Sequence, residues 1–227
     1  MTSIPFYKQL TATLVLLCFG FLATAASMTV EGLKAEMKKS YQACKSIQFN
    51  YAQSVRSTMS NEIRSSSGTF YFKSPNLLKI EQKSPEQQWI VCNGNKVTVY
   101  TPRFKQATRY SWEAWAEGNF FLLCLTGSKE SLEKLEKGYQ WTIENKEAPE
   151  SFECLEVHLE PAHDKIENGS LRLWVHRADF FLRKIEWCGE NGLSFTTDLK
   201  DLIVNPELKK SLFNFKEEPT VEIFNIK

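Results

Sequence analysis

The stretch that decides the fold runs from Ser67 to Thr108 and reads SGTFYFKSPNLLKIEQKSPEQQWIVCNGNKVTVYTPRFKQAT. Its apolar residues recur at every second position in short runs, which is the pattern of half-buried β-strands. Breaker residues separate the runs, among them Pro75 and the pair Asn93–Gly94, a strong signal for a tight hairpin turn. The serine-rich segment Ser65–Gly68 also predicts a turn. The stretch therefore predicts a succession of β-hairpins.

The chain on either side continues this pattern. Thr29 is placed to cap a helix over residues 30–44, whose apolar residues recur at three- and four-residue steps and so share one face. Alternating segments predict strands near residues 47–51, 139–143, 155–159, 171–175, 185–187, 193–199 and 221–226. About ten or eleven short strands at hairpin spacing predict an antiparallel all-β fold. One sheet of that length must curl, either closing into a barrel or wrapping around its helices.

The alternation stops between residues 112 and 125. This segment is densely apolar, and Gly118 divides it into two short helical pieces. A charged helix follows at residues 129–137 and ends at Gly138. The apolar segment has two interpretations: a pair of core helices, or a lid that plugs the concave face of the curled sheet and can be displaced. A lid would keep water from an apolar concavity that would otherwise invite aggregation.

The N-terminus has the order of a secretory signal peptide. Lys8 precedes an apolar run over residues 10–21, and small residues follow at 23–26, so cleavage after Ala25 fits the usual rule. The alternative is an uncleaved membrane anchor, but the run is shorter than the roughly 20 apolar residues that a spanning helix needs. We therefore expect a signal peptide at residues 1–25 and a single domain at residues 26–227.

The charge balance excludes one class of partner. Residues 1–25 contain one lysine and no acid, so the remainder carries 27 basic and 27 acidic residues. No block of like charge stands out, so no surface for nucleic acid is expected. The chain has 16 Phe, 7 Tyr and 6 Trp, enough to build a core and to line a cavity as well.

Cysteine and histidine residues give no site. The cysteines after residue 25 are Cys44, Cys92, Cys124, Cys154 and Cys188. Their spacing excludes a C-x-x-C metal or redox pair. An oxidising compartment favours one or two disulfides, while the alternative is that at least three of these residues are small buried apolar side chains.

The three histidines, His158, His163 and His176, are not spaced to converge on a metal. The nucleophile elbow, the zinc-protease, P-loop and dinucleotide motifs are all missing from the sequence. We therefore expect no catalytic residue, no metal and no cofactor.

A succession of landmarks resembles the periplasmic outer-membrane lipoprotein carrier family of the LolA type. The landmarks are Gln53, Gly68 with Phe70 and Phe72, Pro75-Asn76-Leu77, Ile90-Val91, Gly94, Tyr100-x-Pro102 and Gln106-Ala107-Thr108, followed by Gly118-Asn119 ahead of Phe121-Leu122, Leu171 to Arg177, Ile185, Gly192, Asn205, Phe213 and Phe215. Each landmark is weak alone, but their order is kept along the whole segment after the signal peptide.

The resemblance implies a fold and a function. The fold is an unclosed, curled antiparallel half-barrel of about 10–11 strands whose concave face is covered by an N-terminal helix and mid-chain helices. The function is that of a non-enzymatic, monomeric periplasmic carrier for acylated lipoproteins. Such a carrier receives its cargo from an inner-membrane lipoprotein-releasing ABC transporter complex and delivers it to an outer-membrane lipoprotein receptor.

The resemblance also implies site residues. Leu78, Ile80 and Ile90 match positions that line the cavity of the family, and Phe70, Phe72 and Trp89 are further candidates on the same strands. Phe121, Leu122 and Leu125 fall in the lid. At the position before Pro75 the family carries a basic residue that latches the lid, whereas this chain has Ser74. Lys73 points to the opposite face and is a poor substitute, so the means of latching stays open.

Two other functions stay open. One is an envelope sensor domain that has the same curled sheet and reports the presence of lipid or lipoprotein. The other is an enzyme that acts on lipid or uses a cysteine, for which no motif exists. Cys124, in the lid segment, leaves open a disulfide that restrains the lid.

Overall fold

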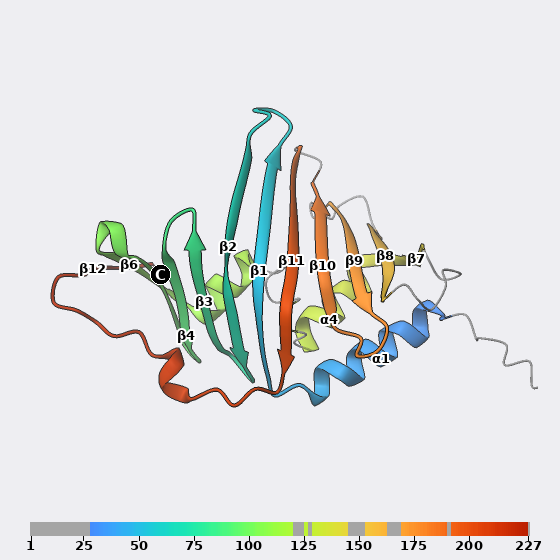
Figure 1. The fold of residues 1–227 in the computed structure, drawn as a ribbon, viewed down its shortest axis with the longest axis horizontal. Helices are drawn as coiled ribbons and strands as arrows, with labels where there is room; N and C mark the ends of the chain where they lie inside the picture. The colour runs from blue at the N-terminus through green and yellow to red at the C-terminus, as the bar shows by residue number, and fades with distance from the viewer. Residues whose placement is uncertain are drawn as a thin grey trace, which may run out of the picture.

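A single sheet dominates the computed structural model, which describes residues 28–119, 125–126, 129–144, 153–162, 169–189 and 192–226 (Figure 1). Its strands are β1 (Ser46–Ser57), β2 (Ile63–Lys73), β3 (Leu77–Ser84), β4 (Gln88–Asn93), β5 (Lys96–Thr101), β6 (Gln106–Ser111), β7 (Tyr139–Ile143), β8 (Cys154–Pro161), β9 (Ser170–His176), β10 (Leu182–Cys188), β11 (Leu193–Val204) and β12 (Glu222–Asn225). The helices are α1 (Val30–Ala43), α2 (Trp112–Gly118) and α4 (Lys129–Gly138), with short 3₁₀ turns η1 (Pro102–Phe104) and η2 (Lys210–Phe213). The prediction of an all-β fold with few helices is confirmed.

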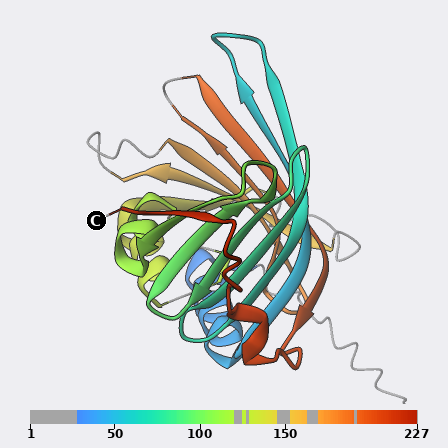
Figure 2. The same ribbon diagram turned by 90° about the vertical axis from the view of Figure 1, so that its left-hand side faces the viewer.

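The strand order shows that the sheet is unclosed. From edge to edge it runs β12-β6-β5-β4-β3-β2-β1-β11-β10-β9-β8-β7, a 12-stranded sheet in the described residues. The two edge strands, β12 and β7, come from opposite ends of this order and are not neighbours. Figure 2 shows the sheet curling, with the helices on its inner side.

One strand pair corrects the prediction of a purely antiparallel sheet. β12 pairs with β6 in parallel, while the other ladders are antiparallel. The segment between β11 and β12 carries the chain past the lower ends of the strands and round to the β6 edge of the sheet (Figure 1), where β12 joins it in parallel. The terminal alternation predicted the strand but not its direction.

The predicted turn at Ser65–Gly68 is wrong, because these residues lie inside β2. The chain turns earlier, at residues 58–60, so β1 and β2 form a long hairpin that projects beyond its neighbours (Figure 1). Gly68 lies where the register of β2 against β3 shifts, and a Cβ there would collide with the backbone carbonyl oxygen of Glu81. The glycine therefore permits a β-bulge rather than a turn.

The N-terminal helix forms as the sequence predicts and closes one end of the sheet. The Thr29 hydroxyl accepts a hydrogen bond from the Gly32 N–H at 3.0 Å, which caps α1. Leu33, Met37 and Tyr41 form its buried face. The Tyr41 ring meets Phe181 edge-on with ring centroids 4.7 Å apart, so α1 is fastened beside β10.

The cysteines give no disulfide among the residues that the structure describes. Cys44, Cys92, Cys154 and Cys188 are not joined by disulfides, and Cys124 lies outside the described residues. Of the four, Cys92 is fully buried and Cys188 is exposed. Cys44 and Cys154 are half-buried, so Cys92 alone of these four is a buried side chain, and the interpretation that at least three cysteines are buried is wrong.

Two further expectations concern the N-terminus and membrane helices. Residues 1–25, the expected signal peptide, lie outside the described residues. None of the described helices is both long and apolar enough to span a bilayer.

Candidate functional site: an apolar cavity on the concave face

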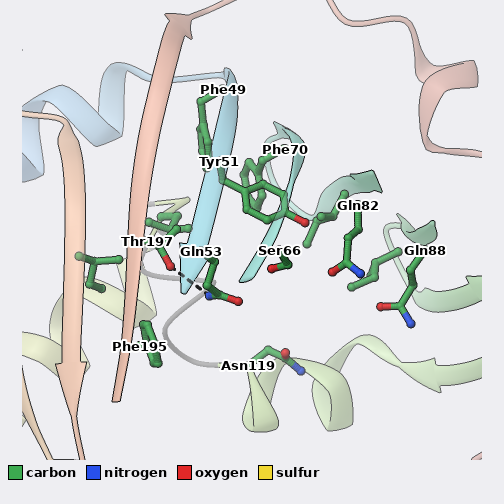
Figure 3. A pocket seen from close by; sticks show the side chains of 14 residues that line it. Phe49, Tyr51, Gln53, Ser66, Phe70, Gln82, Gln88, Asn119, Phe195 and Thr197 are labelled. Carbon is green, nitrogen blue, oxygen red and sulfur yellow. Dashed lines mark hydrogen bonds between the residues drawn. The ribbon is translucent and has the colours of Figure 1, made fainter. Parts of the chain in front are cut away.

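A cavity of about 290 Å³ opens on the concave face of the sheet (Figure 3). Its base is a row of apolar side chains aligned by the strand register: Phe49 opposite Phe70, Phe70 opposite Ile80, and Ile80 opposite Ile90. The Phe49 and Phe70 rings stack with centroids 4.5 Å apart. Because residues paired across strands share one face, four strands supply one continuous apolar floor.

The remaining walls come from distant parts of the chain. Ile185 of β10 and Phe195 of β11 lie on one side of the cavity, and Asn119 and Leu125 close it from across the sheet. Leu125 is only 5 % exposed. The Asn119 side-chain amide donates to the Trp115 carbonyl oxygen at 2.7 Å, which fixes the end of α2 over the cavity.

Along the same strands the apolar floor gives way to a polar rim, defined here as Tyr51, Gln53, Ser66, Gln82, Gln88 and Thr197. The register explains its continuity, because Gln53 pairs with both Ser66 and Thr197, and Gln82 pairs with Gln88. Figure 3 shows these side chains facing the same space.

The amides of the polar rim are held in place by hydrogen bonds. Gln53 Nε2 donates to the Thr197 hydroxyl at 3.0 Å, and Gln82 Nε2 donates to the Glu86 carbonyl oxygen at 3.0 Å. Gln88 Nε2 donates to the Thr101 hydroxyl at 3.3 Å. A Gln carboxamide has two N–H donors and one acceptor oxygen, and each of these bonds uses one of the two donors.

The described part of the cavity lining carries no charged side chain. None of the described residues that line it is Asp, Glu, Lys, Arg or His. Burial raises the pKa of Tyr51 to about 12, so its phenol is neutral at physiological pH. Within the described part of the chain, no group of His, Cys, Asp and Glu is arranged to hold a metal. The described lining offers shape and apolar surface with neutral hydrogen-bonding groups along one side.

Four of the predicted site residues meet in this cavity: Phe70, Ile80, Ile90 and Leu125. Phe72 and Leu78 lie on the same face one alternation step further along β2 and β3, and both are buried in the packed core beside the cavity. The lid residues Phe121 and Leu122 lie outside the described residues.

Trp89 differs from its expected placement. It directly precedes Ile90 in β4, so alternation turns its side chain to the outer face. There it is 39 % exposed and lies beside Tyr100, which in turn contacts Phe215. Trp89 therefore belongs to an outer groove beneath the C-terminal segment, because two adjacent residues of a strand cannot face the same side.

Ser74 lies in the exposed turn after β2. Its backbone N–H donates to the Lys45 carbonyl oxygen at 2.9 Å, and its side chain makes no hydrogen bond to a described residue. Lys73 points to the other face, as expected, and its Nζ donates to the Leu208 carbonyl oxygen at 2.8 Å. Lys73 thus holds the C-terminal segment, and neither residue fastens the described part of the lid.

The sequence reasoning missed several lining residues, including Phe49, Tyr51 and Phe195. Their alternation was visible, but assigning them to a cavity requires the register of β1 against β2. The wrong turn at Ser65–Gly68 concealed that register, because the true hairpin places Phe49 directly opposite Phe70. Gln53 was noted as a landmark, and its carboxamide proves to be part of the rim.

Comparison with known proteins agrees with this geometry. The family model "Outer membrane lipoprotein carrier protein LolA" matches residues 42–216. The chain belongs to this family. Two relatives, both named outer-membrane lipoprotein carrier protein, show how far the sequences have diverged. The Haemophilus ducreyi protein is 23 % identical over 95 % of each chain. The Haemophilus influenzae protein is 27 % identical over 76 % of this LolA-family chain and 77 % of its own.

Solved structures support the fold of this LolA-family protein. An uncharacterised conserved protein from Thermus thermophilus covers 86 % of this chain and 98 % of its own, with a TM-score of 0.55 and 9 % identity. MucB gives a TM-score of 0.51 at 10 % identity, with 82 % of this chain and 62 % of its own covered. The Mycobacterium tuberculosis lipoprotein LppX gives 0.50 at 11 % identity, with 80 % and 99 % covered. At these identities the likeness concerns the fold alone.

Proposed function

We propose that this protein is a periplasmic carrier that binds the acyl chains of lipoproteins in the concave cavity and moves them from the inner to the outer membrane. The observation that carries the proposal is the uncharged cavity with an apolar floor on the concave face. Membership of the lipoprotein carrier family supports it. The candidate binding residues are Phe70, Ile80 and Ile90 on the floor, with Leu125 on the covering side.

The energetics of the cargo explain why a carrier is needed. Removing an acyl chain from water is favourable by about 0.8 kcal/mol per CH₂, so a lipidated protein does not leave a membrane for water unaided. A carrier must match most of that burial and yet release the chain to the next site. An exchange of apolar partners meets both demands without a covalent step.

The size of the cavity indicates how loading occurs. Its 290 Å³ lies at the lower end of the roughly 300–1,000 Å³ typical of pockets for drug-sized ligands. Two or three long acyl chains need more room. The cavity must therefore widen, and the covering side with Leu125 moves more easily than the floor, whose strands are tied by backbone hydrogen bonds.

The partners follow from the direction of transfer. The carrier receives its cargo from an inner-membrane lipoprotein-releasing ABC transporter complex and gives it to an outer-membrane lipoprotein receptor. It acts without catalysis and without a cofactor, in the periplasm, after cleavage of a signal peptide at residues 1–25. The covering side of the cavity is the surface at which we place both handovers.

A matched pair of variants tests the proposal. Ile90→Gln introduces an amide into the cavity floor, whereas Trp89→Gln makes the same change one residue earlier on the outer face. We expect Ile90→Gln to weaken binding of a fluorescent diacylated lipopeptide by about 5- to 150-fold, because an unsatisfied buried polar group costs about 1–3 kcal/mol. Trp89→Gln should bind as the unmodified protein does. Equal affinities for both variants would contradict the assignment of the cavity.

The alternative, a lipid-sensing envelope domain with the same sheet, makes a different prediction. A sensor holds lipid and changes its affinity for a protein partner, but does not pass the lipid on. Incubation of the loaded protein with acceptor vesicles that carry the outer-membrane receptor separates the two functions. Transfer of the lipopeptide supports the carrier, and retention of the lipopeptide supports the sensor.

A further inference from the structure

The polar rim lies next to the apolar floor, where the polar end of a bound acyl chain would be. Along β1, Gln53 stands four residues beyond Phe49 on the same face, and along β3, Gln82 stands two residues beyond Ile80. At about 3.3 Å per residue, the rim therefore lies roughly 7–13 Å from the apolar floor. It is a second chemical zone in the same cavity, adjacent to the zone that would take hydrocarbon.

The chemistry of the polar rim is that of uncharged hydrogen-bonding groups. Gln53, Gln82 and Gln88 each use one N–H in the hydrogen bonds described above, which orients the carboxamides. For each amide, the second N–H has no partner among the described residues, so it can donate to a ligand. Ester and amide carbonyl oxygens are the acceptors that directly follow an acyl chain.

The absence of charge in the described lining decides which headgroup fits. A phosphate brought into a half-buried rim loses water, and no described lining residue supplies a cation to replace it. Burial of an unpaired charge is strongly unfavourable, whereas a neutral carbonyl needs one donor. The rim thus treats two lipids with the same acyl chains differently.

We propose that the polar rim is a specificity site, which binds the neutral ester and amide linkages of a lipidated N-terminal cysteine and disfavours phosphate-bearing lipids. This inference rests on the proposed carrier function and adds the selection of cargo over bulk phospholipid. A carrier that works between two phospholipid membranes would otherwise fill with phospholipid. The acyl chains alone give no such discrimination, since both lipids carry them.

The experiment measures competition between lipids that share acyl chains. The exported protein, purified from the envelope fraction and delipidated, is loaded with a fluorescent dipalmitoylglyceryl-cysteine peptide. Dipalmitoylglycerol and dipalmitoyl phosphatidylglycerol are then added as competitors. We expect the neutral diacylglycerol to displace the probe at a concentration at least about tenfold lower than the phosphatidylglycerol, the ratio that one unsatisfied polar group produces.

Charge variants locate the effect. Gln82→Lys and Gln88→Lys each place a cation in the rim, and each should raise the affinity for phosphatidylglycerol about tenfold, as expected for a charge-assisted hydrogen bond. Gln48→Lys is the matched control, because Gln48 directly precedes Phe49 in β1 and so lies on the opposite face. It adds the same charge to the molecule without adding it to the rim.

Each outcome has one meaning. Preference for the neutral lipids, reduced about tenfold by Lys at position 82 or 88 but not at 48, supports the inference. Equal competition by phosphatidylglycerol and diacylglycerol overturns it and leaves the carrier function intact, since the lipopeptide still binds. A gain from Gln48→Lys as large as that from Gln82→Lys also overturns it. Failure to bind the lipopeptide at all rejects the proposed function itself.

Discussion

Neighbouring residues in the strands beneath the cavity serve different surfaces. Ile90 lies on the cavity floor, while Trp89 contacts Tyr100 on the outer face. Phe49 and Phe70 are each 1 % exposed and stack on one another, so they support the floor as well as line it. Substitutions in this region therefore test packing and binding together, and the two effects must be measured separately.

The stacked pair makes a prediction about stability. Phe70→Ala removes a buried ring and leaves a cavity, so we expect the free energy of unfolding to fall by about 3–5 kcal/mol. Phe104→Ala removes an equal side chain that is 57 % exposed, and should change it by less than about 0.5 kcal/mol. Urea denaturation measures both. A loss at Phe70 no larger than that at Phe104 would show that the stack contributes little.

Tyr51 makes a prediction about alkaline pH. Burial raises the pKa of Tyr51 to about 12, above the value near 10 of an unfolded tyrosine. The neutral phenol is therefore favoured by folding, and this contribution is complete below about pH 10 and lost as the pH rises through the folded-state pKa. We expect Tyr51→Phe to lose less stability than the unmodified protein between about pH 10 and 12. Parallel stability curves over that range would contradict the burial of this phenol.

At the scale of elements, the β2–β3 ladder depends on one glycine. The register of β2 against β3 shifts between Ser67 and Gly68, and the backbone of Glu81 occupies the space that a side chain at Gly68 would need. The bulge lies between Tyr51 and Gln82 in the register, both of which belong to the polar rim. The bulge therefore determines the register of β2 against β3, the strands that carry Ser66 and Gln82 of the rim.

Two glycine substitutions separate a steric effect from a conformational one. Gly94 has φ +110° and open space around it, so Gly94→Ala should lower the free energy of unfolding by about 1–2 kcal/mol, the usual penalty of a left-handed conformation. The new Cβ in Gly68→Ala would collide with the backbone of Glu81, so this variant should lose more unfolding free energy than Gly94→Ala. Thermal unfolding of both variants checks the order. A Gly68→Ala protein as stable as the Gly94→Ala protein would show that the bulge adjusts freely.

The elements differ in how well the sequence predicts them. α1 follows from its 3.6-residue period and the Thr29 cap, and the β4–β5 hairpin from Asn93–Gly94. The turn before β2 was misplaced because polar residues dominate the projecting part of the β1–β2 hairpin, where Ser65 and its neighbours form a strand without a buried face. Of the cavity floor, Phe70, Ile80 and Ile90 were named as candidates, whereas Phe49 and the polar rim require the cross-strand register, which local sequence does not give.

At the scale of the whole molecule, the sheet divides into a packed half and a hollow half. The part formed by β8, β9 and β10 is filled by its own leucines together with α1, whereas the part formed by β1 to β4 carries the cavity. A ligand that fills the hollow half adds contacts that the empty protein lacks. Binding therefore couples directly to stability.

This coupling gives a prediction for the loaded protein. A diacylated lipopeptide at about one hundred times its dissociation constant should raise the free energy of unfolding by about 2.7 kcal/mol. The same peptide without acyl chains should leave it unchanged, which is the control. Differential scanning calorimetry measures the shift. Stabilisation by the unacylated peptide would assign the binding to the peptide rather than to the apolar cavity.

The central claim is that the concave cavity holds the acyl chains of a lipoprotein, and native mass spectrometry of the protein recovered gently from the envelope tests it most directly. We predict a discrete adduct that fragments to an acylated N-terminal cysteine peptide, and its loss in Ile90→Gln but not in Trp89→Gln. A bare mass that persists after incubation with detergent-solubilised lipoprotein would contradict the claim.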